Sequence, residues 1–197
     1  MNYQLELEKI INSLDGKKKL LLHSCCAPCS SYCITYLKDF FDITILYYNP
    51  NIEPIEEYNK RKNEQIKLCN LFNIKVLDCD YDNDLFHEVV KGLEDIPEGG
   101  ARCFKCYELR LRKTAELASS YDYFGTTLTI SPLKNSRKIN EIGIMLEKEY
   151  GVRYLLSDFK KKEGYKQSIL LSKKYDLYRQ NFCGCIYSMP REIERVN

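Results

Sequence analysis

The sequence lacks an apolar run long enough to cross a membrane, and it begins without an apolar leader and cleavage site. An excess of charge of one sign is also missing, because 30 Lys and Arg against 28 Asp and Glu leave a net charge of +2. So small a net charge neither requires nor excludes a nucleic-acid partner. We find no repeat and no linker. These absences predict a cytoplasmic protein with no membrane partner and one domain over residues 1–197, long enough to bury a sizeable core.

Cysteine, by contrast, is abundant and unevenly distributed. Seven of the ten cysteines fall in three short clusters: Cys25, Cys26 and Cys29; Cys103 and Cys106; Cys183 and Cys185. In a reducing cytoplasm, clustered thiols are typical of metal ligands or redox groups rather than of structural disulfides. The sequence therefore predicts that the fold brings the three clusters together around metal.

The spacing within each cluster carries further information. Cys103 and Cys106 form a C-x-x-C pair, which serves zinc, an iron–sulfur cluster or a redox dithiol equally well. Cys25 and Cys26 are adjacent, and neighbouring side chains of an extended backbone point to opposite sides, so they are expected to serve two neighbouring metals. The glycine between Cys183 and Cys185 allows the backbone to turn tightly. The two thiols then bind either the same metal centre or two neighbouring centres.

Seven thiols exceed the four that a structural zinc or a cubane cluster needs. A division into four and three is the natural hypothesis: one four-iron cluster and one mononuclear ion whose fourth position is open or filled by Asp80, Asp158 or His23. The alternative is a single zinc site with spare core cysteines. Structural roles are predicted for the remaining candidates, which are Cys33, Cys69, Cys79 and His87.

Hydrophobic patterning predicts strands that alternate with helices. The predicted strands are 20–23, 43–48, 74–77, 121–125 and 154–156. The predicted helices are 5–14, 28–40, 55–72, 84–90, 107–117, 135–150 and 164–175. This order implies a single α/β domain with a mainly parallel sheet flanked by helices, and metal-binding loops at one edge of it. Residues 126–131 either continue the fourth strand or form a loop, and Cys29 is expected in a first helical turn that lowers its pKa.

Six groups of residues, in one order between about residues 19 and 188, together resemble the QueH family of epoxyqueuosine reductases. They are LHSCCAPC (22–29), YNPNI (48–52) with Glu57, Tyr58 and Arg61, GGARCFKCY (99–107), TLTISP (127–132), DFKK (158–161) and YRQNFCGC (178–185). The resemblance implies a nucleotide-hydrolase-like, Rossmann-like fold. It also implies the last step of queuosine biosynthesis, in which epoxyqueuosine at the tRNA wobble position is reduced to queuosine.

The resemblance further implies an iron–sulfur cluster and an additional iron, with no cobalamin and with electrons from an external donor; zinc can replace iron in purified protein. Tyr107 and Asp158 are the predicted proton donors. Basic side chains are predicted to contact the anticodon loop of the tRNA or to orient the substrate: Arg61, Arg102, Lys134, Arg137, Lys138, Lys160, Lys161, Lys162 and Arg179.

Three other functions are compatible with parts of this pattern. A tRNA-thiolating or adenylating enzyme of similar fold predicts a phosphate-binding loop rich in glycine and serine after the first strand, where this chain has Cys25, Cys26 and Pro28. A zinc-stabilised RNA-binding module predicts zinc without sulfide. A thiol–disulfide oxidoreductase does not account for the surplus of clustered thiols.

Overall fold

A sheet of five parallel strands forms the centre of the protein in this computed structural model, which describes residues 1–189. The strands are β1 (Lys18–His23), β2 (Phe41–Tyr47), β3 (Lys75–Asp78), β4 (Tyr123–Thr126) and β5 (Arg153–Tyr154). Their spatial order is β3-β2-β1-β4-β5. The predicted α/β class, the parallel sheet and all five predicted strands are confirmed.

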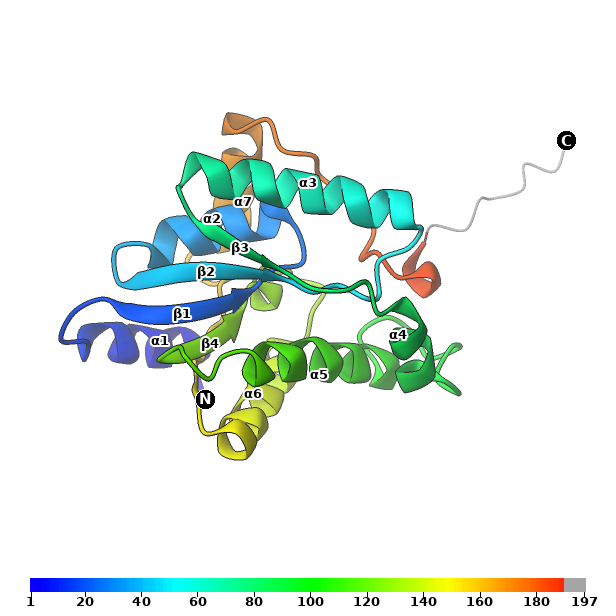
Figure 1. Cartoon of the computed structure of the whole chain (residues 1–197), viewed down its shortest axis with the longest axis horizontal. Helices are drawn as coiled ribbons and strands as arrows, with labels where there is room; N and C mark the ends of the chain where they lie inside the picture. The colour runs from blue at the N-terminus through cyan, green and yellow to red at the C-terminus, as the bar shows by residue number, and fades with distance from the viewer. Residues whose placement is uncertain (190–197) are drawn as a thin grey trace, which may run out of the picture.

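Helices cover both faces of this sheet (Figure 1). They are α1 (Tyr3–Asn12), α2 (Ala27–Leu37), α3 (Ile55–Leu71), α4 (Asn83–Val90), α5 (Ala101–Glu116), α6 (Ser136–Tyr150) and α7 (Gly164–Lys174), with 3-10 turns η1 (Leu128–Ile130) and η2 (Ile186–Ser188). Figure 1 shows α2, α3 and α7 on one side of the sheet and α5 and α6 on the other.

The apolar run of β1 explains its central position. Leu20 and Leu22 belong to the core cluster that contains α2, whereas Leu21 between them belongs to the cluster formed with α5 and α6. All three side chains are fully buried. Because both faces of β1 pack against helices, the strand is continuously apolar rather than alternating, as is typical of a central strand in a parallel sheet.

The strand order reverses next to β1. The chain goes from β1 to β2 on one side, whereas β4 pairs with the other side of β1. Connections that leave the carboxyl ends of two such strands in opposite directions open a crevice, which is where α/β proteins bind ligands. Cys25 and Cys26 follow β1 directly, so the first thiol cluster lies at this crevice.

Two elements differ from the sequence prediction. Helix α5 begins at Ala101, well before the predicted start at residue 107, so Cys103 and Cys106 lie in its first two turns rather than on a loop. The reason is local: Gly99 has φ 88° and Gly100 caps the helix in an extended conformation, which lets the helix begin immediately after them. The hydroxyl-rich residues after β4 form the turn η1 and do not continue the strand.

Within residues 1–189, no helix combines the length and the apolar character that a membrane span requires. The domain predicted from the sequence extends to residue 197, and residues 190–197 lie outside the described part.

Candidate functional site

The first thiol group consists of Cys25, Cys26 and Cys29. Their Sγ atoms all lie within 4.8 Å of one another, and those of Cys25 and Cys26 are 3.8 Å apart. The chain bends at Cys25 before Cys26 caps helix α2, and this bend turns both thiols to one side. The expectation that the two adjacent thiols point to opposite sides is therefore wrong, because it assumed a continuous extended backbone, and their division between two metals stays a prediction.

The three thiols of this group strongly affect one another's pKa. Hydrogen bonding with Cys26 and then with Cys29 lowers the pKa of Cys25 well below its usual value. Hydrogen bonding with Cys25 and Cys26, reinforced by burial, raises the pKa of Cys29. Hydrogen bonding with Cys25 raises the pKa of Cys26 to about 12. Cys29 does occupy the first turn of α2, as predicted, but the predicted lowering of its pKa is wrong. The neighbouring thiols affect the pKa of Cys29 more strongly than the helix end does. Cys25 is therefore the thiol of this group that ionises most readily.

The second thiol group combines two distant segments. Cys103 and Cys106 face inward from α5, and Cys183 and Cys185 lie on the segment before η2. Burial raises the pKa of Cys103 and raises that of Cys106 to about 12, and the nearby charges of Cys183 and Cys185 raise both further. The backbone N–H of Gly99 donates to Cys103 Sγ at 3.2 Å. Within residues 1–189 only Cys25, Cys26 and Cys29 lie close enough together to share a metal. The electrostatic influence of Cys183 and Cys185 places them near Cys103 and Cys106, and the convergence of all three clusters around metal stays a prediction.

Arg61 of α3 holds the segment that carries Cys183. Its side chain is 1% exposed, forms an ion pair with Glu57 at 2.6 Å, and donates to the carbonyl oxygen of Cys183 at 2.9 Å. Its guanidinium also stacks on the ring of Phe182 at 5.0 Å. A Cβ on Gly184, whose φ is +123°, would lie 2.9 Å from Arg61 Nη1, so this position requires glycine. Arg61 therefore positions thiols and is closed to solvent.

Arg110 is a site residue that the sequence analysis missed. It is 1% exposed, donates to Asn49 Oδ1 at 2.6 Å, and directs a second N–H at Cys106 Sγ, 3.8 Å away. Burial acts against its charge, yet the negative charge on Cys106 and Cys25 outweighs burial and raises the pKa of the guanidinium. The spacing from Cys106 is i to i+4, so a correct helix start at residue 101 would have placed Arg110 on the same face.

None of the three candidates for the open metal position joins a thiol group within residues 1–189. His23 is fully buried; its two ring nitrogens contact Thr126 Oγ1 and the carbonyl oxygen of Tyr48, each at 3.0 Å. Burial, followed by the charge of Arg110, lowers the pKa of His23 to about 3, which keeps it neutral. Asp80 is exposed.

Asp158 lies 2.6 Å from Lys160 Nζ and lines a separate hollow with Arg137 and Lys161. Lys162 forms an ion pair with Glu8, so two of the three lysines in the basic run that begins at Lys160 are paired with acidic groups.

Lys134 and Tyr107 reach the thiols from different elements. Burial disfavours the charged form of Lys134, but the charges of Cys183 and Cys25 outweigh it and raise the pKa of its ammonium. Tyr107 is 3% exposed, and burial together with the charge of Cys103 raises its pKa, so that its phenol stays protonated. At neutral pH both side chains therefore carry a proton beside the thiols.

A pocket of about 330 Å³ opens onto these groups. Cys25, Cys29 and Cys183 line it, together with Lys134 and several groups from the loops around it: Glu98, Ser131, Leu133, Tyr165, Arg179, Gln180, Asn181, Phe182 and Ser188. Gln180 Nε2 donates to Cys26 Sγ at 2.9 Å. The volume falls within the range of small-molecule sites, and it suits one nucleoside better than a duplex.

The other predicted RNA contacts differ in accessibility. Arg102 is 3% exposed, and its guanidinium donates to the carbonyl oxygens of Glu94 and Ile96 and stacks on Tyr187. Arg137 is exposed and pairs with Glu141. Arg179 is exposed at the pocket. Contacts with RNA remain a prediction for the exposed residues, whereas Arg102 stabilises the loop before α5.

The isolated cysteines and His87 occupy structural positions. Cys33 and Cys69 are fully buried in the core beside α2, as predicted. Cys79 packs, partly buried, against the cluster of the other sheet face. His87 contacts Glu53 at 2.9 Å and Tyr187 at 3.3 Å.

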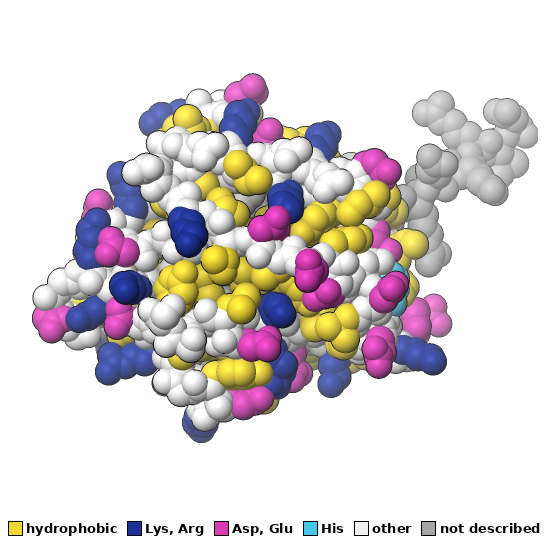
Figure 2. All heavy atoms as spheres, viewed as in Figure 1, with side chains coloured by type: hydrophobic (Ala, Val, Ile, Leu, Met, Phe, Trp, Pro, Cys, Tyr) yellow, Lys and Arg dark blue, Asp and Glu magenta, His cyan; other side chains and the backbone are white. Residues whose placement is uncertain are grey.

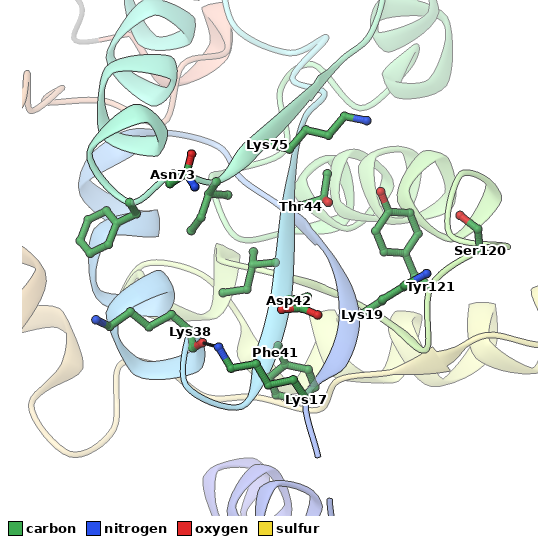
Figure 3. Close-up of a pocket in the computed structure, with 13 residues that line it drawn as sticks. Lys17, Lys19, Lys38, Phe41, Asp42, Thr44, Asn73, Lys75, Ser120 and Tyr121 are labelled. Atoms are coloured by element: carbon green, nitrogen blue, oxygen red, sulfur yellow. Dashed lines mark hydrogen bonds between the residues drawn. The ribbon is translucent and has the colours of Figure 1, made fainter. Parts of the chain in front are cut away.

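A larger hollow, of about 490 Å³, lies at the opposite edge of the sheet (Figure 3). Lys17, Lys19, Lys38 and Lys75 line it with Asp42, and Figure 3 shows Lys38 and Lys75 extending in opposite directions. It contains no thiol, and it adjoins the amino ends of strands, where α/β folds rarely place chemistry. On the face shown in Figure 2, Lys and Arg are interspersed with Asp and Glu. The cysteine pocket is therefore the candidate site.

Comparisons with known proteins bear on the fold and the family of this chain. Solved structures with a similar fold include the U34-tRNA thiolase NcsA from Methanococcus maripaludis with its [4Fe-4S] cluster (TM-score 0.58, 13% identity, 95% of this chain and 67% of that chain). Another is a predicted subunit of tRNA methyltransferase from Methanocaldococcus jannaschii (TM-score 0.53, 16% identity, 79% of this chain and 76% of that chain). At these identities the likeness establishes the fold alone.

Sequence relatives are much more similar. The epoxyqueuosine reductase QueH of Staphylococcus epidermidis is 42% identical, covering 98% of this chain and 86% of the relative. That of Streptococcus pyogenes is 43% identical (93% and 75%), and that of Thermotoga maritima is 36% identical (89% and 93%). The family model described as epoxyqueuosine reductase QueH matches residues 20–191, which include all seven clustered cysteines. The chain therefore belongs to the QueH family of epoxyqueuosine reductases.

Proposed function

We propose that this protein reduces epoxyqueuosine to queuosine at the wobble position of tRNA, without cobalamin, by means of a [4Fe–4S] cluster and a second iron. The observation that carries the proposal is the close group of Cys25, Cys26 and Cys29 at the carboxyl edge of the sheet, with Cys183 from the far end of the chain lining the same pocket as Cys25 and Cys29. A tRNA substrate and free thiols both fit a cytoplasmic protein.

The donor set fits these metals. Four thiolates satisfy a [4Fe–4S] cluster, and Cys103 and Cys106, influenced electrostatically by Cys183 and Cys185, would together supply that number. Three thiolates leave a position open on a single iron, and Cys25, Cys26 and Cys29 already lie within 4.8 Å of one another. Zinc would compete for the same thiolates in protein purified in air.

The reaction needs two electrons and two protons. Both carbon–oxygen bonds of the epoxide break, a carbon–carbon double bond forms, and the oxygen leaves as water. Bound iron centres would act as Lewis acids toward the epoxide oxygen and would supply electrons one at a time. An external donor must then replace those electrons.

The chain's own contribution is to hold protons and exclude water. Tyr107 keeps its phenolic proton because its pKa is raised, and we assign to it the transfer of a proton to the departing oxygen. Lys134 holds a positive charge beside Cys183 and Cys25 and can restore that proton. Asp158 is engaged by Lys160, which leaves Tyr107 as the stronger candidate of the two predicted donors.

Metal content and turnover of anaerobically purified protein test this proposal. We expect more than four irons and about four sulfides per chain, with a brown colour. Such protein, given a chemical reductant and tRNA that contains epoxyqueuosine but no cobalamin, should yield queuosine in a nucleoside digest analysed by mass spectrometry. The matched control is the same protein after iron is removed by a chelator.

Two results would contradict the proposal. Zinc alone, with no sulfide even after anaerobic reconstitution, would favour the zinc-stabilised RNA-binding module. Full iron and sulfide content without any queuosine formed would leave the cluster in place but assign it to another reaction.

A further inference from the structure

The rim of the cysteine pocket carries an aromatic and an aliphatic side chain that the proposed chemistry does not use. Tyr165, the second residue of α7, is 39% exposed, and Leu133, on the loop between η1 and α6, is 72% exposed. Both line the pocket whose interior contains Cys25 and Cys183. At the mouth of a polar pocket, such exposed side chains are available to contact a bound ligand.

The backbone at Tyr165 is held firmly in place. A Cβ on the preceding Gly164 would collide with the carbonyl oxygen of Phe159 and with the ring of Tyr32, so helix α7 begins in close contact with both. The hydroxyl of Ser168 donates to the carbonyl oxygen of Tyr165 at 2.6 Å. The ring is therefore mounted on a rigid element rather than on a loose loop.

The guanidinium group of Arg179 lies beside the Tyr165 ring. The guanidinium carbon of Arg179 lies 6.0 Å from the centre of the Tyr165 ring, and its Nη1 donates to the buried hydroxyl of Ser172 at 3.1 Å. Arg179 itself is exposed and lines the pocket. An aromatic face beside a cation is the combination that stacks unpaired nucleobases and attracts the adjoining phosphate.

The pocket also offers a hydrogen-bond acceptor that has no partner. Gln180 donates through Nε2 to Cys26 Sγ, while its Oε1 is buried and makes no hydrogen bond with the described residues. A buried acceptor without a partner costs stability unless a ligand supplies a donor. The N–H groups on a base edge, or a sugar hydroxyl, would supply one.

We propose that Tyr165 and Arg179 form a stacking subsite for the wobble nucleobase of the anticodon loop, with Leu133 as an apolar contact in the same pocket and Gln180 Oε1 as an acceptor. The subsite rests on the proposed function, because it presents the base to the thiol-lined interior. It takes a base with a flat ring and an adjoining phosphate, in single-stranded RNA.

The sequence contains no tryptophan, which makes a direct test available. Tyr165→Trp places a single indole at the subsite, and Tyr121→Trp places one at the opposite sheet edge as a control. Adding an anticodon stem-loop RNA that contains epoxyqueuosine should quench the fluorescence of Tyr165→Trp and leave that of Tyr121→Trp unchanged. A stem-loop with an abasic wobble nucleotide should quench Tyr165→Trp far less, because its phosphates remain but its base is gone.

Affinity gives the second readout. Tyr165→Ala should raise the Kd for the same stem-loop about 5- to 100-fold, whereas Tyr165→Phe, which keeps the ring, should stay within about twofold of the wild type. Iron content and thermal unfolding of both variants should match the wild type, since the side chain is exposed.

Two outcomes overturn the subsite. If Tyr165→Ala binds the stem-loop as tightly as the wild type does, or if the abasic and intact probes quench Tyr165→Trp equally, Tyr165 does not stack on a base. In that case wild-type turnover of the tRNA still supports the proposed function. Wild-type protein that neither binds nor reduces the tRNA overturns both.

Discussion

Three arginine side chains, Arg61, Arg102 and Arg110, are at most 3% exposed, and all three come from helices that carry or support the thiols. A buried charge is tolerated only with partners. Arg61 has Glu57 and the carbonyl oxygen of Cys183, and Arg102 has backbone carbonyls. Arg110 has the Asn49 amide, and the negative charge that raises its pKa comes from thiolates, chiefly Cys106.

Arg110 should therefore contribute more to stability than its half-buried neighbour Arg112. Arg110→Gln leaves Asn49 Oδ1 and Cys106 Sγ without their buried donor, so we expect a decrease of about 3 kcal/mol in the free energy of unfolding. Arg112→Gln on the same helix removes two partly exposed ion pairs, with Glu108 and Glu149, and should cost about 1 kcal/mol. Denaturant unfolding of the anaerobic proteins measures both, and equal decreases would contradict the assigned role of Arg110.

Tyr107→Phe should lower turnover roughly 10²- to 10⁴-fold, the usual size of a general-acid contribution, because it removes the phenolic proton and little volume. Iron and sulfide content should not change. Tyr154→Phe makes the same substitution at a buried tyrosine of β5 whose hydroxyl has no partner among the described residues, and it should keep full activity. Full turnover by Tyr107→Phe with normal metal content would remove Tyr107 from the proton-donor role.

Two elements bring the group of four thiols together. Helix α5 presents Cys103 and Cys106 one turn apart, and the segment before η2 reaches them from the far end of the chain. Contacts to α3 and to the loop before it hold that segment: Tyr178 donates its hydroxyl to Glu57, and the backbone N–H of Glu53 donates to the carbonyl oxygen of Gly184 at 2.8 Å. The position of this segment thus depends on α3 as much as on metal.

Gly184→Ala tests this dependence. The new Cβ would press on Arg61 Nη1 and Ile52 Cγ1 at a φ of +123°, so we expect a destabilisation of about 1–3 kcal/mol and a decrease in bound iron. Gly16→Ala introduces the same side chain at a φ of +143° where no atom lies within 4 Å, away from the thiols. This control should also be somewhat less stable but keep its iron. Retention of full iron content by Gly184→Ala would show that the segment tolerates displacement.

At the scale of the whole molecule, the two edges of the sheet differ in character. The carboxyl edge holds the thiols, Tyr165 and Arg179, whereas the amino edge holds the lysine-lined hollow of Figure 3. Net charge is small, so long-range attraction cannot select one edge for a tRNA. We therefore expect local basic groups near the pocket to position the RNA backbone.

Charge reversal at each edge should separate these contributions. Arg137→Glu with Lys138→Glu, near the start of α6, should weaken tRNA binding, and the slope of log K against log salt concentration should fall by about 0.7–0.9 for each phosphate that the variant no longer neutralises. The double variant Lys19→Glu with Lys75→Glu, at the amino edge, should change neither the affinity for tRNA nor its salt dependence. Filter binding at several salt concentrations measures the slopes, and equal effects at both edges would place the tRNA differently.

Much of this architecture follows from local patterns. The apolar run 20–22, the β-branched run 43–45 and the spacing of the helical faces are sufficient for the alternating strands and helices, because periodicity and burial are local consequences of residue type. The order of the six motifs was sufficient to predict the family, because six separate segments rarely match the motifs of one family in the same order by chance.

What the sequence by itself determined, then, is the α/β class and the family, whereas the convergence of all seven thiols on metal stays a prediction. Tertiary structure alone decided how the thiols group. The bend at Cys25 and the early start of α5 give the cysteine side chains directions that an ideal strand or a loop would not give. It also decided the roles of buried charges: Arg61 and Arg102 were predicted to meet RNA or substrate, but their burial assigns them to the protein's own backbone. Burial depends on which distant segments pack over a side chain, and that information is absent from local sequence.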